Sequence, residues 1–485
     1  MATNDRNLSL LMDFYQLTMA NGYFNSPNRD TIGYYDLYFR KAPDNASFAI
    51  CAGLDTAIDY LEQLHFSEEE IDFLRGKNIF SEDFLDYLLN FKFECDVWAI
   101  PEGSVVFPNE PLVVVRGPYI QAQLLETMLL LTINHQSLIA TKTNRMVRAS
   151  EGRAILEFGS RRAQGPDAAN LGAKAAYIAG AFGTANTLAD YLYNTPALGT
   201  MAHSWVQSFD TEIESFKAYA KAYPNSTTLL VDTYDTLRSG VPNSIKCFDE
   251  ILKPMGVRPV GIRLDSGDMA YLSKEARKML DEAGYEDVKI VASNSLDEYK
   301  IRDLLLQGAK IDTFGVGENL ITSKSNPVFG GVYKLVAVEK HGEVEPKIKV
   351  SENIEKITTP GIKQIYRIYD KETDKAKADL ITIRSEIIDE SKPLTIFHPL
   401  YTWKRKTINN YYVKPLLVQI FDKGKLIYDR PSLEEIKEYC QKEINTLWDE
   451  YKRLEQPQVY KVDLSQDLWD LKTNLLNEAK RKVTD

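Results

Sequence analysis

The chain has 485 residues, which at roughly 150 residues per domain is enough for about three domains. Hydrophobic residues make up 44% and charged residues 26%, a composition typical of soluble globular proteins and unlike that of disordered chains. The formal net charge is −11 and no basic block is present. The composition therefore argues against a nucleic-acid or membrane partner, although local basic pockets remain possible.

The cysteines suggest neither a zinc site nor a disulfide framework, because they lie dozens of residues apart and form no CxxC pair. They are Cys51, Cys95, Cys247 and Cys440. So few thiols fit a reducing compartment. The first residues are polar and charged rather than signal-like, and no run of 18 apolar residues occurs. We therefore expect a cytoplasmic protein.

Residues 1–136 mix helical and strand patterns and are expected to form an N-terminal α/β domain. Residues 8–24 carry apolar side chains at helical spacing, with Gly22 near their end. Residues 31–43 alternate like a strand, and residues 104–118 indicate two strands around a Pro-Asn turn. A long apolar helix is predicted next, over about 121–150.

The pattern changes over residues 153–339, where short apolar runs end in polar clusters and helical patterns follow several of them. The turns recur at the spacing of a βα unit. Helices are predicted over 209–223, 269–284 and 297–308. About eight such units favour a closed parallel barrel over an open doubly wound sheet, which stays the alternative. We assign residues 137–340 to this (β/α) barrel domain, and 341–485 to a C-terminal domain with strands and a helical tail.

In a βα barrel, ligands meet the chain at the carboxyl ends of the strands. Polar clusters follow the predicted strands at 157–162, 199–204, 232–235, 263–268, 293–294 and 315–317. A purely structural barrel would need turn-forming residues there, but not arginines, aspartates and a histidine together. The sequence therefore predicts an active site along this rim.

Two glycine pairs, Gly315 with Gly317 and Gly330 with Gly331, can present bare backbone N–H groups to a phosphate. Tight βα turns explain each pair equally well. The sequence contains no GxxxxGK[ST] motif, so any use of ATP must avoid a P-loop.

The charged residues of the rim have both functional and structural interpretations. A guanidinium beside a buried strand needs an anionic partner, which is either a ligand or a protein carboxylate. The aspartates can bind a Mg²⁺–diphosphate, hydrogen-bond sugar hydroxyls or cap helices, and capping suits Asp268 best. His203 follows a strand end, where base, proton-carrier or phosphoryl-acceptor roles are available. The arginines are Arg161, Arg162 and Arg263, and the other aspartates are Asp232 and Asp265.

Taken together, these motifs resemble the nicotinate phosphoribosyltransferase family. The resemblance rests on 10–24, 101–112, GSRRAQGPD (159–167), GTMAHSW (199–205), DTYDTLRSGVPN (232–243), GIRLDSGD (261–268), FGVGENLITS (314–323) and 330–339. It implies an irregular (β/α) barrel of the type II phosphoribosyltransferase kind, with an N-terminal α/β domain and a C-terminal domain. The implied reaction converts nicotinate and 5-phosphoribosyl-1-diphosphate to nicotinate mononucleotide and diphosphate. The resemblance also implies coupling to ATP through a phosphohistidine, Mg²⁺ held largely by the diphosphate, and a homodimer with shared active sites.

The resemblance assigns roles residue by residue. His203 falls on the phosphorylated histidine, Arg263 and Thr200 on nicotinate-contacting positions, and Phe158 and Tyr15 on the aromatics that sandwich the pyridine ring. Tyr15 would come from the partner subunit. Arg161 falls on an anion-binding position, Asp265 on the ribose hydroxyls, and Asp232 near the diphosphate and metal. The turn from Gly315 to Gly317 would hold the 5′-phosphate, and Ser293 and Asn294 complete the expected substrate-binding set.

One residue departs from the family pattern. Glu318 stands where relatives often carry Thr, and an acidic side chain beside a phosphate is repulsive. We therefore expect Glu318 to point away from the site, or the phosphate contact to be made by backbone alone.

Two other functions remain open from the sequence. A sister phosphoribosyltransferase would use nicotinamide or quinolinate instead of nicotinate. Nicotinamide relatives tend to carry a carboxylate just after the Gly-Thr pair, where this chain has Met201, which favours an acid substrate. A non-catalytic nucleotide-sensing homologue would keep the fold, but the joint presence of His203, Arg263 and Asp265 argues against it.

Overall fold

The computed structural model describes residues 6–484, which divide into two compact units. The first unit combines the described residues through Leu138 with those from Val328 onward, and the second is Ile139–Pro327. Residues 341–485, expected as a separate domain, therefore share a compact unit with the N-terminal segment. Helix α6 (Glu126–Ala149) begins in the first unit and ends in the second.

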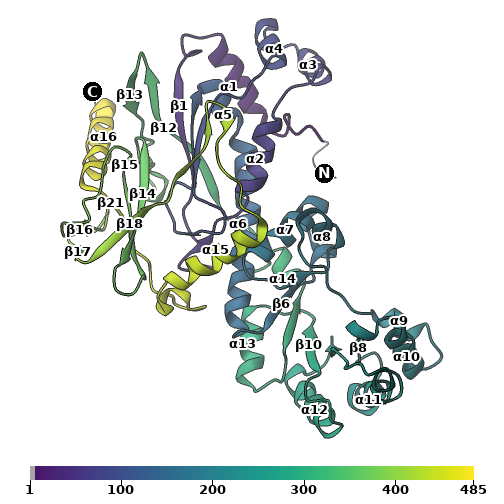
Figure 1. Cartoon of the computed structure of the whole chain (residues 1–485). Helices are drawn as coiled ribbons and strands as arrows, with labels where there is room; N and C mark the ends of the chain where they lie inside the picture. The colour runs from purple at the N-terminus through teal and green to yellow at the C-terminus, as the bar shows by residue number, and fades with distance from the viewer. Residues whose placement is uncertain (1–5, 485) are drawn as a thin grey trace. The chain divides into compact units, whose positions relative to one another are not determined.

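The first unit is built on a seven-stranded antiparallel sheet (Figure 1). Its strands, in spatial order, are β13 (Glu343–Pro346), β12 (Gly331–Lys340), β1 (Ile32–Phe39), β5 (Val113–Pro118), β3 (Asp96–Ala99), β19 (Val418–Asp422) and β20 (Lys425–Leu426). Residues 330–339, expected as part of the barrel, instead form β12, which pairs antiparallel with β1. That assignment was wrong because an apolar run alone does not identify the sheet it joins.

Besides the start of α6, the described residues of this unit form three smaller sheets and seven helices. A four-stranded sheet has the order β18 (Tyr411–Pro415), β14 (Lys363–Asp370), β15 (Ala376–Ile383) and β21 (Val462–Leu464). The two-stranded sheets are β2 (Ala49–Ile50) with β4 (Val105–Val106), and β16 (Leu394–Phe397) with β17 (Arg405–Ile408). The helices are α1 (Phe14–Phe24), α2 (Leu54–Gln63), α3 (Glu68–Arg75), α4 (Glu82–Leu89), α5 (Tyr119–Leu124), α15 (Leu433–Thr446) and α16 (Gln466–Thr484).

A buried charge cluster joins the C-terminal strands to the N-terminal ones. Arg367 of β14 forms ion pairs with Asp379 at 2.7 Å and with Glu443 at 2.8 Å. The same guanidinium donates to the carbonyl of Val105 in β4 at 2.8 Å. A buried guanidinium is tolerated only when it is paired in this way. This cluster and the pairing of β19 with β3 explain why residues 341–485 pack as part of the first unit.

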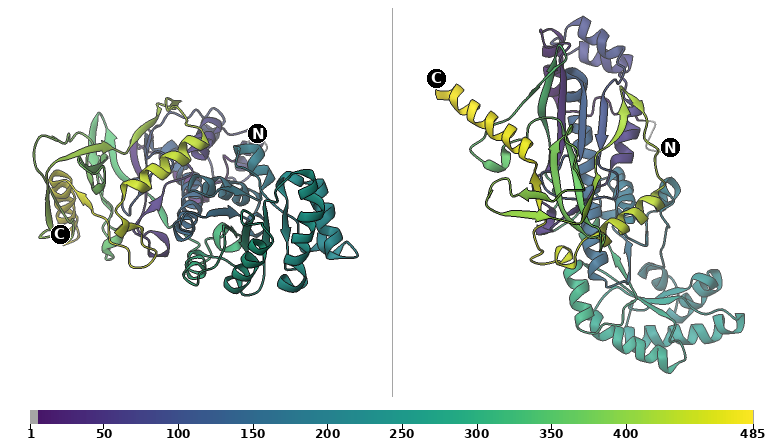
Figure 2. Two further views of the ribbon diagram at one scale, coloured as in Figure 1. Left: turned by 60° about the horizontal axis from the view of Figure 1, so that its bottom comes forward. Right: turned by 60° about the vertical axis from the view of Figure 1, so that its left-hand side comes forward.

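The second unit contains a six-stranded parallel sheet with helices around it (Figures 1 and 2). Its spatial order is β7 (Gly183–Thr184), β6 (Ala154–Glu157), β11 (Thr313–Val316), β10 (Lys289–Ser293), β9 (Gly261–Leu264) and β8 (Thr228–Leu230). The helices are α7 (Pro166–Ile178), α8 (Thr187–Tyr193), α9 (His203–Gln207), α10 (Glu212–Ala222), α11 (Val241–Cys247), α12 (Met269–Glu282), α13 (Glu298–Leu306) and α14 (Glu318–Ile321).

The parallel α/β character of this unit is confirmed, but the expected count of about eight units is wrong. Besides β12, which belongs to the other sheet, the segment before His203 contributes only an isolated bridge between Thr184 and Ala197. Among the described residues no strand pairing joins β7 to β8, so the barrel is irregular and its ladder is open between these two strands.

Local sequence signals placed the helices well. Helix α12 begins after Asp268, whose carboxylate accepts from the backbone N–H of Tyr271 at 3.0 Å, as expected for a capping residue. Helix α13 is capped in the same way by Asp297. Helix α1 begins later than expected, where the side chain of Gln16 accepts from the backbone N–H of Asp13 at 2.9 Å.

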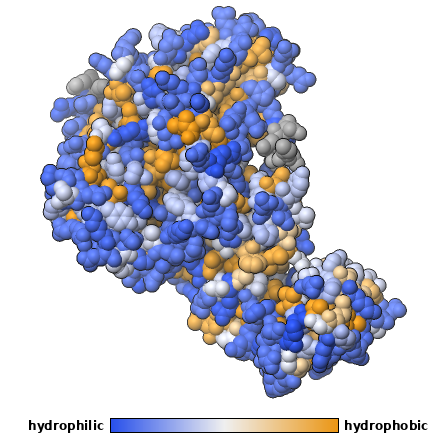
Figure 3. All heavy atoms as spheres, viewed as in Figure 1, coloured by the Kyte–Doolittle hydropathy of each residue, from blue (hydrophilic) through white to orange (hydrophobic). Residues whose placement is uncertain are grey.

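The visible face in Figure 3 is mainly hydrophilic, with apolar residues in scattered patches. Among the described residues, none of the helices combines the length and apolarity that crossing a bilayer requires.

Candidate active site

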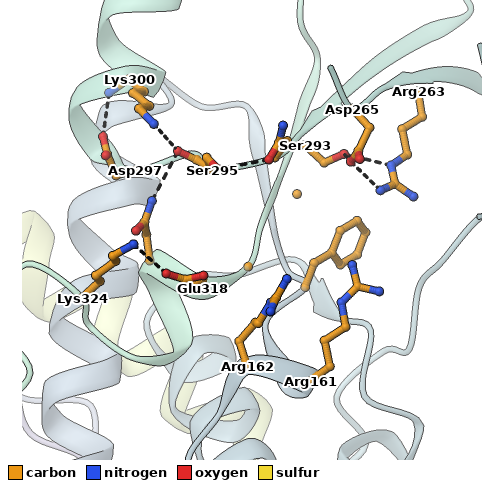
Figure 4. Close-up of a pocket in the computed structure, with 15 residues that line it drawn as sticks. Arg161, Arg162, Arg263, Asp265, Ser293, Ser295, Asp297, Lys300, Glu318 and Lys324 are labelled. Carbon is orange, nitrogen blue, oxygen red and sulfur yellow. Dashed lines mark hydrogen bonds and ion pairs between the residues drawn. The ribbon is translucent and has the colours of Figure 1, made fainter. Parts of the chain in front are cut away.

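A cavity of about 480 Å³ lies in the second unit, beyond the carboxyl ends of β6, β9, β10 and β11 (Figure 4). This is the rim that the sequence predicts. The cavity is lined by Phe158, Arg161, Arg162, Arg263, Asp265, Ser293, Asn294, Ser295, Asp297, Lys300, Gly315, Gly317, Glu318, Asn319 and Lys324. Eight of the twelve expected site residues are among them; His203, Thr200, Asp232 and Tyr15 are not.

Arg263 and Asp265 lie together at the upper right of Figure 4 and form an ion pair. The guanidinium of Arg263 donates from Nη2 to Asp265 Oδ1 at 2.8 Å and from Nε to Ser293 Oγ at 2.9 Å. The Ser293 hydroxyl in turn donates to Asp265. Burial opposes ionisation of Asp265, but the Ser293 hydroxyl and the Arg263 charge outweigh it and lower the pKa of this carboxyl.

The remaining nitrogen of Arg263 is held only loosely. Its Nη1 lies 3.4 Å from Thr200 Oγ1 and 3.5 Å from the carbonyl oxygen of Met201, the long limit for a hydrogen bond. The structure thus brings Thr200 to Arg263 as expected. A guanidinium fixed along one edge and loosely bound on the other can accept a planar anion.

Asp232 supports the ion pair of Arg263 and Asp265 through the loop that follows β9. Its Oδ2 accepts from the backbone N–H of Asp265 at 2.8 Å and from the hydroxyl of Ser266 at 2.7 Å. Its Oδ1 is buried and has no hydrogen-bond partner. Asp232 therefore fixes the loop after β9 and keeps one carboxylate oxygen unused.

His203 is the first residue of α9 and is 40% exposed at its side chain. Its Nδ1 lies 3.1 Å from Thr233 Oγ1, and its Nε2 lies 3.8 Å from Asp265 Oδ2. The structure therefore brings His203 to the Asp265 carboxylate, with the imidazole accessible from solvent. An exposed imidazole beside a carboxylate can take up or release a proton during contact with a ligand.

Phe158 follows β6, and two glycines make room for its loop. Gly315 lies inside β11, where a Cβ would stand 2.5 Å from Cδ2 of Phe158. Gly159 packs against α14, where a Cβ would meet Ile321 at 2.6 Å. The aromatic ring lies with its centroid 5.9 Å from Cζ of Arg263. Position 315 therefore requires glycine because the ring of Phe158 occupies the space of a side chain there. The sequence did not reveal this reason.

Glu157, the last residue of β6, anchors the same loop from inside the protein. Its carboxylate accepts from the Thr184 hydroxyl at 2.6 Å and from the backbone N–H of Gly159. Burial raises the pKa of this carboxyl, although both hydrogen bonds oppose the shift.

The second glycine pair lies outside the cavity. Gly331 begins β12 in the first unit, and its backbone N–H donates to Asn134 Oδ1 at 3.1 Å. A side chain at this position would collide with Asn134. Gly331 is therefore explained by packing and Gly330 by a turn with φ of 76°, but this turn precedes an antiparallel strand rather than belonging to a βα unit.

Several lining residues escaped the sequence analysis. Lys300 donates to the carbonyl of Ser295 at 2.7 Å, and Asn319 donates to the same carbonyl at 3.3 Å. Lys324 pairs with Glu318 at 2.6 Å. A cap before α13 was visible in the sequence, but no local pattern showed that Lys300 and Lys324 turn toward one cavity.

Tyr15 belongs to the first unit and lies in α1. Its hydroxyl donates to Glu126 Oε2 at 2.8 Å, while the residue stays 46% exposed. Partial burial, together with the Glu126 carboxylate, raises the pKa of the phenol. The ring is therefore held on the surface of its own unit.

Comparison with known proteins identifies the family to which these residues belong. The models of the nicotinate phosphoribosyltransferase N-terminal domain, family and C-terminal domain match residues 10–134, 154–382 and 362–472. A nicotinate phosphoribosyltransferase of Bacillus subtilis is 44% identical over 483 residues, which cover 99% of this chain and 98% of the relative. The chain belongs to the nicotinate phosphoribosyltransferase family.

Other relatives agree. A nicotinate phosphoribosyltransferase of Dictyostelium discoideum is 37% identical over 521 residues, covering 96% of this chain and 88% of the relative. The crystal structure of human nicotinic acid phosphoribosyltransferase superposes with a TM-score of 0.82 at 30% identity, covering 96% of this chain and all of that one. The expected fold class, an α/β protein of the type II phosphoribosyltransferase kind, is confirmed.

The close approach of Gly315 to Phe158 predicts a cost for any side chain at that glycine. Gly315→Ala should lower the midpoint of thermal unfolding by several degrees, because overpacking typically costs about 1–3 kcal/mol. Calorimetry of the purified chain measures this. Gly199→Ala is the matched control, since a Cβ there meets nothing within 4 Å.

The penalty should shrink in a Phe158→Ala background, which removes the ring that the new methyl group meets. A Gly315→Ala chain as stable as the wild type would show that the glycine does not fix the ring.

Proposed function

We propose that this protein transfers the phosphoribosyl group of 5-phosphoribosyl-1-diphosphate to nicotinate, releasing diphosphate and nicotinate mononucleotide. Membership of the family supports the reaction class. The observation that carries the substrate choice is Arg263, whose guanidinium is held on one edge by Asp265 and Ser293 and faces the Phe158 ring. A planar carboxylate on an aromatic ring suits this pair of neighbours.

The bond changes need no nucleophile from the protein. The lone pair of the pyridine nitrogen forms the new bond to C1 of the ribose, and the bond from C1 to the diphosphate oxygen breaks, with its electron pair leaving on the diphosphate. Positive charge develops on the ribose as this bond lengthens. The protein therefore needs to position the two substrates and to offset charge.

The residues that line the cavity, together with Thr200 beside it, can position the substrates and offset the charge. Arg263 and Thr200 would orient nicotinate against Phe158, and Asp265 would hold the ribose hydroxyls with Oδ2, which lies free of the Arg263 contact. Arg161 would bind phosphate oxygens. Ser293 would keep Asp265 ionised, so that its negative charge faces the ribose as positive charge develops there.

Magnesium fits this site as a companion of the substrate rather than as a resident ion. Among the described residues no group of three or more His, Cys, Asp or Glu side chains could hold a metal. Asp232 Oδ1 is a buried carboxylate oxygen without a partner, and such an oxygen suits Mg²⁺ bound mainly by diphosphate. The ion would neutralise the leaving diphosphate.

A nicotinamide substrate has less support in this geometry. Nicotinamide relatives tend to carry a carboxylate after the Gly-Thr pair to accept from the amide, and this chain has Met201 at that place. The Asp265 oxygen nearest to Arg263 is already engaged by Arg263 and Ser293. A positively charged guanidinium with one loosely bound edge favours the acid.

The Arg263 contact predicts a large loss of activity on truncation. Wild-type protein should form labelled nicotinate mononucleotide from labelled nicotinate and 5-phosphoribosyl-1-diphosphate. Arg263→Ala should lower kcat/KM by about 30- to several-thousand-fold, the cost of about 2–5 kcal/mol for a lost buried charge contact. Arg263→Lys should also be impaired because it lacks the planar fork.

Arg258→Lys is the matched control, because Arg258 forms an exposed pair with Asp287 and does not line the cavity. Near-normal nicotinate kinetics in Arg263→Ala would contradict the assigned role, and a wild-type chain that forms no product would contradict the proposed function.

His203 is proposed to carry the phosphoryl group through which ATP hydrolysis is coupled to the transfer. Incubation with γ-labelled ATP should leave an acid-labile, base-stable phosphate on the protein, and His203→Ala should abolish it. His65→Ala, at an exposed histidine of the first unit, should keep the label. Persistence of the label in His203→Ala would assign the acceptor to another residue.

A homodimer with shared sites is proposed from Tyr15. Its ring is exposed and oriented by Glu126, and the neighbouring side chains Leu11, Phe14 and Met19 are also exposed. An aromatic surface of this kind suits burial against a second chain. Tyr15 would then stack on nicotinate in the partner's cavity.

Mixing two damaged chains tests this arrangement. Tyr15→Ala and Arg263→Ala chains should each be weakly active at low nicotinate, but heterodimers would hold one site free of both lesions. Activity should therefore rise after subunit exchange. If exchange is demonstrated and activity does not rise, Tyr15 does not serve the partner's site.

A further inference from the structure

Glu318 does not point away from the cavity, so the first of the two alternatives expected from the sequence is wrong. It lines the cavity together with Lys324, and its Oε1 accepts from Lys324 Nζ at 2.6 Å (Figure 4). The two residues are six positions apart, so helical spacing alone does not bring them together.

The backbone after α14 creates this pair. Ser323 adopts a left-handed conformation with φ of 43°, and its hydroxyl donates to the carbonyl of Asn326 at 2.9 Å. The backbone N–H of Lys324 donates to the carbonyl of Asn319 at 3.4 Å. The turn thus carries the lysine back to the first residue of α14, beside Gly317.

The surrounding charges favour an anion. The cavity is lined by five cationic side chains and three anionic ones. Arg161 and Arg162 point into the cavity (Figure 4), and Arg162 also helps Lys324 to lower the pKa of Glu318. Glu318 is therefore an ionised carboxylate at neutral pH, in a cationic part of the cavity.

We propose that Glu318 is a displaceable counter-ion that occupies Lys324 until a phosphate monoester binds, and that Lys324 is a phosphate-binding residue of this protein. Naming that ligand as the 5′-phosphate of the phosphoribosyl substrate rests on the proposed function. The exchange transfers the ammonium of Lys324 from a carboxylate to a phosphate, and no covalent bond changes.

The physical properties of the pair suit such an exchange. The side chains are 63% and 46% exposed, and exposed ion pairs contribute little stability, so this pair is easily broken. A phosphate carries up to two negative charges and can contact Lys324 and Arg162 together, whereas the Glu318 carboxylate carries one. The exchange also removes the repulsion that Glu318 would otherwise exert on a bound phosphate.

This account predicts opposite effects for the two members of the pair. Ribose 5-phosphate is the probe, and calorimetry measures its dissociation constant for the full chain without any need for turnover. Glu318→Gln frees Lys324 and should tighten binding by about 2- to 5-fold. Lys324→Met should weaken it by about tenfold or more, because a charged contact is lost and Glu318 is left unpaired.

The double variant should bind more tightly than Lys324→Met alone and more weakly than the wild type, because the repulsion disappears with Glu318. Glu282→Gln is the matched control. It removes the same charge from an exposed pair, Lys278 with Glu282, that lies on α12 and does not line the cavity, and its affinity should equal that of the wild type.

Unchanged or weaker binding by Glu318→Gln would overturn the proposal, and so would a wild-type chain that does not bind ribose 5-phosphate. The nicotinate assay separates the two ideas. The predicted order of affinities without formation of nicotinate mononucleotide would retain the phosphate site and contradict the proposed function. Formation of nicotinate mononucleotide without the predicted order of affinities would retain the proposed function and contradict the phosphate site.

Discussion

The ion pair between Arg263 and Asp265 fixes the geometry on which the rest of the cavity depends. Arg263 lies at the end of β9 and Asp265 follows it by two residues, so without further support the pair would rest on a loop. Ser293 from the neighbouring strand and Asp232, two residues after β8, supply that support through hydrogen bonds to the Arg263 side chain and to the Asp265 backbone. Three adjacent strands therefore determine where one guanidinium points.

The arrangement suits a reaction whose substrates bring their own nucleophile and leaving group. The cavity instead supplies charged groups and an aromatic surface. These are the Arg263 guanidinium with its loosely held edge, the ionised Asp265 carboxylate, the Phe158 ring and the cations near the Gly317 turn. Such groups act by holding substrates in place and by offsetting developing charge. Because the substrates supply the nucleophile and the leaving group, no Ser-His-Asp or Cys-His arrangement is needed.

Much of this site could be predicted from sequence because the carboxyl ends of parallel strands converge. Arg263, Asp265 and Ser293 each lie at or just after an apolar run, so their meeting follows from the sheet. Pairing partners could not be predicted in the same way. Residues 330–339 resemble a barrel strand, yet they pair antiparallel with β1, because neighbouring strands in a sheet depend on tertiary packing.

The reason for Gly315 and the position of Lys324 also lay beyond the sequence. Gly315 was expected to expose its backbone to a phosphate, whereas its missing side chain accommodates the ring of Phe158. Lys324 reaches the cavity only because Ser323 reverses the chain. Both features depend on contacts between segments or on one backbone angle, which periodicity and motif spacing do not report.

The most direct test of the central claim is a crystal structure of the protein with nicotinate mononucleotide bound. The pyridine carboxylate should lie within hydrogen-bond distance of the Arg263 guanidinium, with the ring against Phe158, the ribose hydroxyls at Asp265 and the phosphate at Lys324. A nucleotide bound with its phosphate at Arg263, or with its carboxylate facing solvent, would contradict the account.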